Sequence, residues 1–176
     1  MSQYKYSPLK SDSSIRLITF DPSSTPDNSL LTIQLSEAQL SETGSFEALS
    51  YTWGDLSDKV PIKIGDQTLM ITLNLKSFLK HLKANEATKD QASTYWADQI
   101  CINQDDIPER NCQVALMAAI YSKSCRTLVW LGEQSPLEAA ALELLQDIDM
   151  LGFTRDHPVH LALPRVVEVI EARIGE

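Results

Sequence analysis

The first half of the chain alternates short apolar runs with polar turns, a pattern typical of β-strands. The predicted strands are residues 15–20, 30–35, 46–53, 60–64 and 68–73. The last two flank Gly65, Asp66 and Gln67, which predicts a hairpin. Pro61 favours an edge position for this hairpin, because proline has no N–H to donate to a neighbouring strand.

The hydrophobic period changes to that of a helix after Asn74, which is a good N-cap residue. Apolar residues then follow at i, i+3, i+4 and i+7: Leu75, Phe78, Leu79 and Leu82. The next predicted strand is residues 94–102, whose last residues can already turn.

A second helix is predicted after Asp106. Asp106 and Glu109 have the spacing of a capping box, and Pro108 falls in the first turn. The expected buried face of this helix is Val114, Met117, Ile120 and Tyr121. Residues 127–131 follow as a continuous apolar run, which is typical of a strand covered on both faces.

The C-terminal part predicts two further helices. Residues 135–138 (SPLE) combine an N-cap serine, a proline and a glutamate three residues after the cap. Residues 152–158 read as a loop, and Pro164 is expected to open a last short helix. The apolar face of that short helix would be Val166, Val169, Ile170 and Ile174.

Strands and helices alternate from residue 46 to residue 149, which indicates an α/β fold with a largely parallel sheet flanked by helices. The strands before residue 46 would add antiparallel or mixed pairs. A length of 176 residues suits one domain. We expect a flexible segment at residues 1–14, the domain at residues 15–150, and a loop with a short helix at residues 151–176, where the domain ends incompletely.

Composition narrows the class of partner. The chain has 15 basic and 24 acidic residues, a net charge of −9, which argues against nucleic acid and against anionic membrane surfaces. It has no apolar run of about 18 residues and no signal-peptide pattern, so we expect no membrane span and a cytoplasmic location. Three cysteines without a CxxC pair argue against a zinc site and predict free, mostly buried thiols.

The common catalytic motifs are absent from the sequence. It contains no phosphate-binding glycine loop, no G-x-S-x-G and no H-E-x-x-H. His81, His157 and His160 are not paired with a nucleophile at a recognisable spacing. No catalytic residue and no metal ligand can therefore be assigned from motifs.

Residues 49–55 (LSYTWGD) form the first candidate site. Tyr51 and Trp53 share one face of the predicted strand by alternation, and Gly54 turns the chain directly after them. Ligands of open α/β sheets bind beyond the carboxyl ends of the strands. The two rings can therefore wall a pocket and stack on a planar group; the alternative is a core aromatic pair.

Residues 96–106 (WADQICINQDD) form the second candidate site. Asp98 is expected inside an apolar strand, where a carboxylate needs a partner, and Arg110 is a candidate for that partner. Asn103 and Gln104 follow the strand, where amide side chains bind a loop backbone or a ligand. Asp98 can coordinate a cation or accept hydrogen bonds from a ribose. The alternative is that Asp98 and Asn103 cap backbone groups of the adjoining loop.

These segments resemble the heterokaryon incompatibility (HET) domain, which occurs in fungal allorecognition and cell-death proteins. The resemblance lies in residues 49–55, in residues 96–106, in residues 109–121 (ERNCQVALMAAIY) and in residues 129–132 (VWLG). The lead-in residues 6–9 (YSPL) and 15–17 (IRL) also fit. It covers residues 6–150 with its motifs in the family order, and it implies that residues 15–150 are a HET-like domain.

HET domains are thought to be related to TIR domains, so the resemblance implies a TIR-like, flavodoxin-like sheet. Some TIR domains cleave NAD with a glutamate on a later helix, whereas others only assemble and recruit partners. The resemblance thus implies NAD as a candidate ligand or substrate, and no other cofactor. HET domains usually continue to a W-F-x-R-x-W-x-x-Q-E segment, which this sequence lacks, so it resembles a shortened domain without the catalytic glutamate.

Three functional hypotheses follow from these observations. The first is a signalling or interaction module in allorecognition or programmed cell death, which binds other signalling proteins or a second copy of itself. The second is a TIR-like NAD-cleaving enzyme or nucleotide-binding domain that uses Tyr51, Trp53, Asp98, Asn103 and Gln104 as ligand-binding residues. The third is a non-functional truncated fragment.

Overall fold

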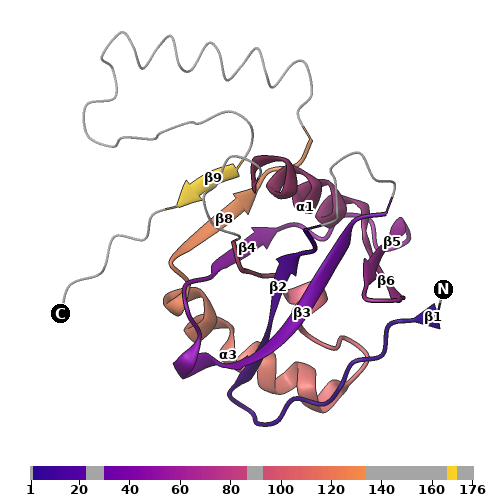
Figure 1. The fold of residues 1–176 in the computed structure, drawn as a ribbon. Helices are drawn as coiled ribbons and strands as arrows, with labels where there is room; N and C mark the ends of the chain where they lie inside the picture. The colour runs from indigo at the N-terminus through magenta and orange to yellow at the C-terminus, as the bar shows by residue number, and fades with distance from the viewer. Residues whose placement is uncertain (1, 23–29, 87–92, 134–165, 170–176) are drawn as a thin grey trace, which may run out of the picture.

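We describe residues 2–22, 30–86, 93–133 and 166–169 of a computed structural model of the chain. Within this part, nine strands form one sheet in the order β1-β6-β5-β3-β2-β7-β4-β8-β9 (Figure 1). The strands are β1 (Ser2–Gln3), β2 (Ser14–Phe20), β3 (Thr32–Gln39), β4 (Glu47–Tyr51), β5 (Lys59–Ile64), β6 (Gln67–Thr72), β7 (Tyr95–Trp96), β8 (Arg126–Trp130) and β9 (Val166–Val169). The helices are α1 (Leu73–Glu86), α2 (Asp98–Cys101) and α3 (Ile107–Lys123), with one turn of 3-10 helix, η1 (Leu40–Glu42).

The α/β class and the additional N-terminal strands are confirmed. Strands β7, β4 and β8 are parallel neighbours, and helix α3 connects β7 to β8. Strand β2 pairs antiparallel with both β3 and β7, which makes the whole sheet mixed. A specifically TIR-like arrangement stays a prediction.

Helices α1 and α3 cover opposite faces of the parallel strands. Alternation along β7 turns Tyr95 and Trp96 to different faces. On the α1 face, Tyr95 contacts Phe20, and Trp130 of β8 stacks on Phe78 of α1. On the other face, Trp96 meets Tyr121 of α3 edge to face. The core therefore lies in two apolar layers, one on each side of β7, β4 and β8.

The predicted hairpin is present as β5 and β6, which pair antiparallel around Gly65. Strand β5 is not an edge strand, because it also pairs with β3. This second pairing involves only Lys63 and Ile64, so Pro61 lies beyond it and removes no hydrogen bond from the β3 ladder.

The predicted strand at residues 94–102 is wrong after its first residues. Strand β7 ends at Trp96, and α2 begins at Asp98. The N–H groups of Ile100 and Cys101 bond to the carbonyl of Ala97, and both of these residues are fully buried. A run of buried residues fits a strand covered on both faces or a helical turn equally well, and here the backbone hydrogen bonds form the helical turn.

Two helix predictions also need correction. Helix α1 begins at Leu73, so Asn74 lies inside the first turn and is not the N-cap. On α3, Ile120 is buried as expected, but Val114 is 55% exposed and Gln113 is buried in its place. The capping box is confirmed at its first bond, because Asp106 accepts a hydrogen bond from the N–H of Glu109 at 3.0 Å.

Residues 166–169 differ from expectation. Residues 166–169, expected to belong to a short helix opened by Pro164, form β9 and pair antiparallel with the edge of β8. Three of these four residues are valine, which favours an extended backbone. The helix predicted from residue 135 lies outside the described residues. At the N-terminus, Ser2 and Gln3 pair with β6, and Tyr6 contacts α2; the flexibility expected for residues 1–14 stays a prediction.

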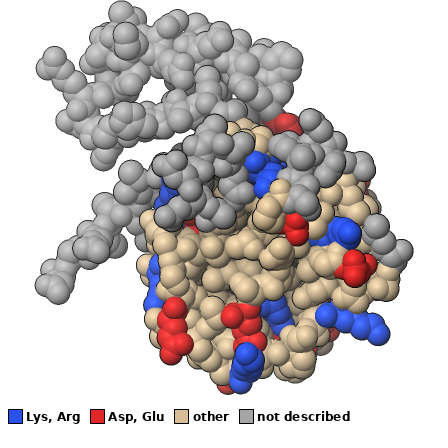
Figure 2. Space-filling model, in the orientation of Figure 1, with Lys and Arg blue, Asp and Glu red and all other residues tan. Residues whose placement is uncertain are grey.

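Other surface features can be stated for the described residues only. Among them, no helix combines the length and apolar character needed to cross a bilayer. No group of three metal-ligating side chains occurs in the same ranges. Cys101 is buried, but Cys112 and Cys125 are exposed, so the thiols are free without being mostly buried. On the face in Figure 2, acidic and basic side chains are interspersed around an uncharged centre.

Candidate functional site

The structure brings Tyr51, Trp53 and Asp98 together, as the sequence suggested, in what we call the Asp98 cluster. Asp98 is the first residue of α2, whereas Tyr51 ends β4. The Tyr51 hydroxyl donates to Asp98 Oδ1 at 2.8 Å, and Trp53 Nε1 donates to Oδ2 at 3.0 Å. The N–H of Gln99 also donates to Oδ1 at 2.7 Å. Both carboxylate oxygens are thus used by the chain itself.

Burial and the neighbouring carboxylate fix the protonation state of Tyr51. Loss of hydration raises its pKa well above the usual value, and the negative charge of Asp98 raises the pKa further. Tyr51 therefore remains a neutral hydrogen-bond donor at physiological pH. It holds Asp98 in place and offers no tyrosinate for catalysis.

The other two candidate residues are tied to the loop after α2. Gln104 Nε2 donates to the carbonyl of Asp98 at 2.9 Å, which adds Gln104 to the Asp98 cluster. Asn103 Oδ1 accepts from the N–H of Asp105, as in the loop-capping alternative. Arg110 does not pair with Asp98; its guanidinium reaches the carbonyl of Gln104 at 3.4 Å. Whether any of these residues binds a ligand stays a prediction.

Replacing Asp98 by alanine should lower the free energy of unfolding by about 1–3 kcal/mol, because two side-chain donors and one N–H lose a charged acceptor. Chemical denaturation followed by tryptophan fluorescence measures this. Asp98→Asn keeps one acceptor oxygen and should cost less, and Asp105→Ala, at an exposed position, should cost less than about 0.5 kcal/mol. An Asp98→Ala protein as stable as the wild type would refute the structural role of the cluster.

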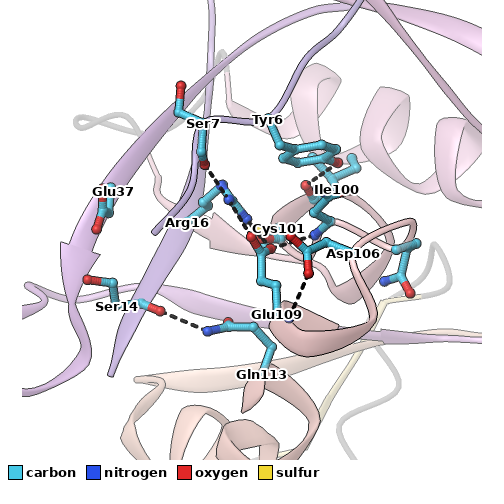
Figure 3. Close-up of polar contacts among 12 residues, drawn as sticks. Tyr6, Ser7, Ser14, Arg16, Glu37, Ile100, Cys101, Asp106, Glu109 and Gln113 are labelled. Carbon is cyan, nitrogen blue, oxygen red and sulfur yellow. Dashed lines mark hydrogen bonds and ion pairs between the residues drawn. The ribbon is translucent and has the colours of Figure 1, made fainter. Parts of the chain in front are cut away.

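A second polar cluster, which sequence reasoning missed, surrounds Arg16 of β2 (Figure 3). The Arg16 guanidinium binds both carboxylate oxygens of Glu109, at 2.6 and 2.9 Å, and the two side chains are 6% and 10% exposed. It also donates to the carbonyls of Cys101 and Ser7. We call these four residues, together with Tyr6, the Arg16 cluster.

The Arg16 cluster joins the N-terminal segment to the candidate loop. The Tyr6 ring lies under the guanidinium, 4.8 Å from its carbon, and the Tyr6 hydroxyl donates to the carbonyl of Ile100 at 2.8 Å. On the other side, Glu109 Oε1 accepts the N–H of Asn103 at 2.7 Å. The pair therefore connects β2, α2, α3 and residues 6–7, and it fixes where the loop after α2 begins.

Glu109 should contribute an acid-sensitive part of the stability. Burial acts to raise its pKa, but the hydrogen bonds from Arg16 and from Asn103 outweigh burial, and the pKa is lowered. A carboxylate with a lowered folded-state pKa stabilises the protein fully above its unfolded pKa, and this contribution is lost as the pH falls through the folded value. The difference in the free energy of unfolding between the wild type and Glu109→Gln should thus decrease from about pH 5 downward.

Melting temperatures of wild type and Glu109→Gln between pH 7 and pH 3 test this expectation. Glu42→Gln, at an exposed position, serves as the control and should differ from wild type by a small amount at every pH. A difference between wild type and Glu109→Gln that is independent of pH would contradict the expectation.

Asn74 links the two motif-bearing strands at their carboxyl ends. Its Nδ2 donates to the carbonyl of Thr52 at 2.6 Å, and its Oδ1 accepts from Trp130 Nε1 at 2.9 Å. Gly54, with a φ of 73°, turns the chain directly beside it. Tyr51 of β4 and Trp130 of β8 pair directly in the sheet, and Asn74 adds a side-chain link just beyond this pair.

A cleft of about 320 Å³ opens next to this link. Its lining residues are Asp55, Asp58, Leu73, Asn74, Ser77 and Glu133. They come from the first turns of α1 and from the segments that follow β4 and β8, which is where open α/β sheets bind ligands. The cleft is acidic, so the residues that line it suit hydroxyl groups or cations better than phosphates.

The sequence motifs and the fold together define an α/β domain. Polar side chains link the carboxyl ends of its two motif-bearing strands, β4 and β8. Residues 46–162 match the family model described as Heterokaryon incompatibility protein (HET), and the chain belongs to this family. It is 31% identical over 168 residues to heterokaryon incompatibility protein 6, OR allele, of Neurospora crassa. The match covers 88% of this chain but 25% of that relative. No solved structure matches the chain.

Proposed function

We propose that this chain is a signalling module that acts in heterokaryon incompatibility or programmed cell death by binding itself or another signalling protein in the cytoplasm. Membership of the HET family and the similarity to a Neurospora crassa incompatibility protein support this proposal. The observation that carries it is the Asp98 cluster. Both oxygens of Asp98 accept hydrogen bonds from donors of the chain itself. The most distinctive motifs therefore stabilise the domain, and its surface is the part that carries the function.

NAD binding or cleavage is the second candidate, and the acidic cleft is the observation that favours it. Carboxylates at the carboxyl ends of parallel strands bind ribose hydroxyls in dinucleotide sites. The same carboxylates repel a pyrophosphate, and the volume of about 320 Å³ is at the low end for a small-molecule site. We therefore rank this candidate second. Incubation of the purified chain with NAD, followed by chromatographic detection of nicotinamide, tests it; turnover abolished by Asp55→Asn would establish it in place of the module.

The signalling proposal is tested by inducible expression of the chain in Neurospora crassa. Growth arrest and uptake of a vital dye are expected on induction. Arg16→Met, which breaks the Arg16 cluster and destabilises the fold, is the matched variant and should reduce both effects. Hyphae that grow like the uninduced culture, with the wild-type protein present at a level confirmed by immunoblot, would overturn the proposal.

A further inference from the structure

Helix α3 presents an outer face without a described partner. Two of its apolar side chains are largely exposed, Ile107 at 59% and Val114 at 55%. Ala115, Ala118 and Ala119 are exposed as well. Figure 1 shows α3 at the periphery of the molecule, below the sheet. Apolar side chains exposed on one helix favour contact with another protein surface.

The helical period gathers these residues on one face. Ile107, Asn111, Val114, Ala118 and Ser122 follow one another at intervals of three or four residues, so they form one stripe. Ala115 and Ala119 lie beside it. The stripe contains no charged residue, although the chain has a net charge of −9. Arg110 lies at the margin of the stripe. Small residues along the stripe allow a second helix to approach closely.

The charges at the two ends of α3 indicate which partner fits. Asp105 and Asp106 directly precede the helix and are exposed, and Lys123, also exposed, is its last residue. An antiparallel copy of the same helix would bring the acidic start of each α3 to the basic end of the other. It would also oppose the two helix dipoles favourably. A parallel copy would place acid against acid and base against base.

We propose that two copies of this chain associate through antiparallel pairing of α3, with Ala115 and Ala118 near the two-fold axis. This inference rests on the proposed signalling function and names the surface that it uses. A helix of 17 residues is about 26 Å long, so the contact lies at the small end of protein interfaces. The dimer should accordingly be weak and should form only as the concentration rises.

Sedimentation velocity of the purified chain from about 5 to 500 μM tests the pairing. The wild type is expected to shift from monomer to dimer over this range. Ala118→Glu, which places a charge in the middle of the stripe, should remain monomeric at every concentration. Met70→Glu, at an exposed apolar residue of β6 on another element, is the matched control and should dimerise like wild type. A wild type that stays monomeric, or an Ala118→Glu protein that dimerises as the control does, would overturn the proposal.

A charge exchange tests the antiparallel orientation. Asp105→Lys and Lys123→Glu should each weaken dimerisation about tenfold, because each creates like-charge contacts at both ends of a symmetric pair. The double variant should restore the wild-type affinity. Lys123 also donates to the carbonyl of Ser41, so the melting temperature of each variant is measured alongside. A double variant weaker than both single variants would refute the antiparallel arrangement.

The two proposals fail in different ways. Sedimentation examines α3 without any cell, whereas the growth assay examines the function without reference to α3. A monomeric wild type that still arrests growth would overturn the α3 pairing and leave the signalling function standing. A dimer that has no effect on hyphal growth would do the opposite.

Discussion

Arg16→Met is expected to lower the free energy of unfolding by about 3–5 kcal/mol, because it leaves the Glu109 carboxylate nearly buried without its cation. The loss includes the hydrogen bonds that Arg16 donates to the carbonyls of Cys101 and Ser7. A deficit of this size is a large fraction of the stability of a typical domain. It should also loosen residues 6–7 and the loop that begins at Asn103, since both are attached to this pair.

Urea denaturation measures the energetic part of this prediction, and amide hydrogen exchange at Asn103 measures the local part. In the double variant Arg16→Met/Glu109→Gln, no unpaired charge remains and glutamine can still accept the Asn103 N–H. It should therefore be more stable than Arg16→Met alone. Lys10→Met, which removes an exposed cation, controls for net charge and should change stability by less than about 0.5 kcal/mol. Strictly additive effects of the two substitutions would show that the ion pair contributes nothing as a pair.

The strands and helices with a clear hydrophobic period could be predicted from the sequence. The hairpin of β5 and β6 and the strand β8 follow directly from apolar runs and turn residues. The prediction failed where several consecutive residues are buried, as at residues 100–102, because a buried run fits a strand or a helical turn equally well. The helix expected after Pro164 is β9 at residues 166–169, where pairing with the edge of β8 decides the conformation.

The candidate residues were found, but their partners could not be deduced. Tyr51, Trp53 and Asp98 meet as expected, because β4 and β7 are parallel neighbours and their carboxyl ends lie together. Arg110 was chosen as a cation partner, whereas the ion pair that forms is Arg16 with Glu109. Adjacent helix residues point about 100° apart, so a choice between positions 109 and 110 depends on the rotation of α3 against the sheet. That rotation is a property of tertiary packing.

The signal for Arg16 was present in the sequence. It is the single charged residue in the run 15–20, where alternation predicts burial on one face of the strand. An arginine in such a strand requires an acidic partner or several carbonyl acceptors, and Arg16 has both. The capping-box interpretation of Glu109 concealed the partner, because the Glu109 side chain turns to Arg16 and leaves the N-cap to Asp106 alone.

Phe78→Ala is expected to destabilise the domain by about 3–5 kcal/mol, because Phe78 is fully buried where α1 packs on β4 and β8. Its ring stacks on Trp130 at a centroid distance of 5.2 Å and meets Tyr51 edge to face at 6.4 Å. A cavity here removes support from both strand ends that carry the motifs. The effect should therefore extend to the Asp98 cluster, which Tyr51 helps to form.

Thermal unfolding gives the stability change, and near-ultraviolet circular dichroism reports the packing of Trp130 in the folded variant. Phe78→Leu, which keeps most of the apolar volume, should cost less than half as much as Phe78→Ala. Leu73→Ala removes a residue of the same helix that is 47% exposed and should cost less than about 1 kcal/mol. If Phe78→Ala and Leu73→Ala were equally mild, α1 would not be the element that holds the strand ends together. The cleft lined by Asp55, Asn74 and Glu133 would then have no rigid wall on its α1 side.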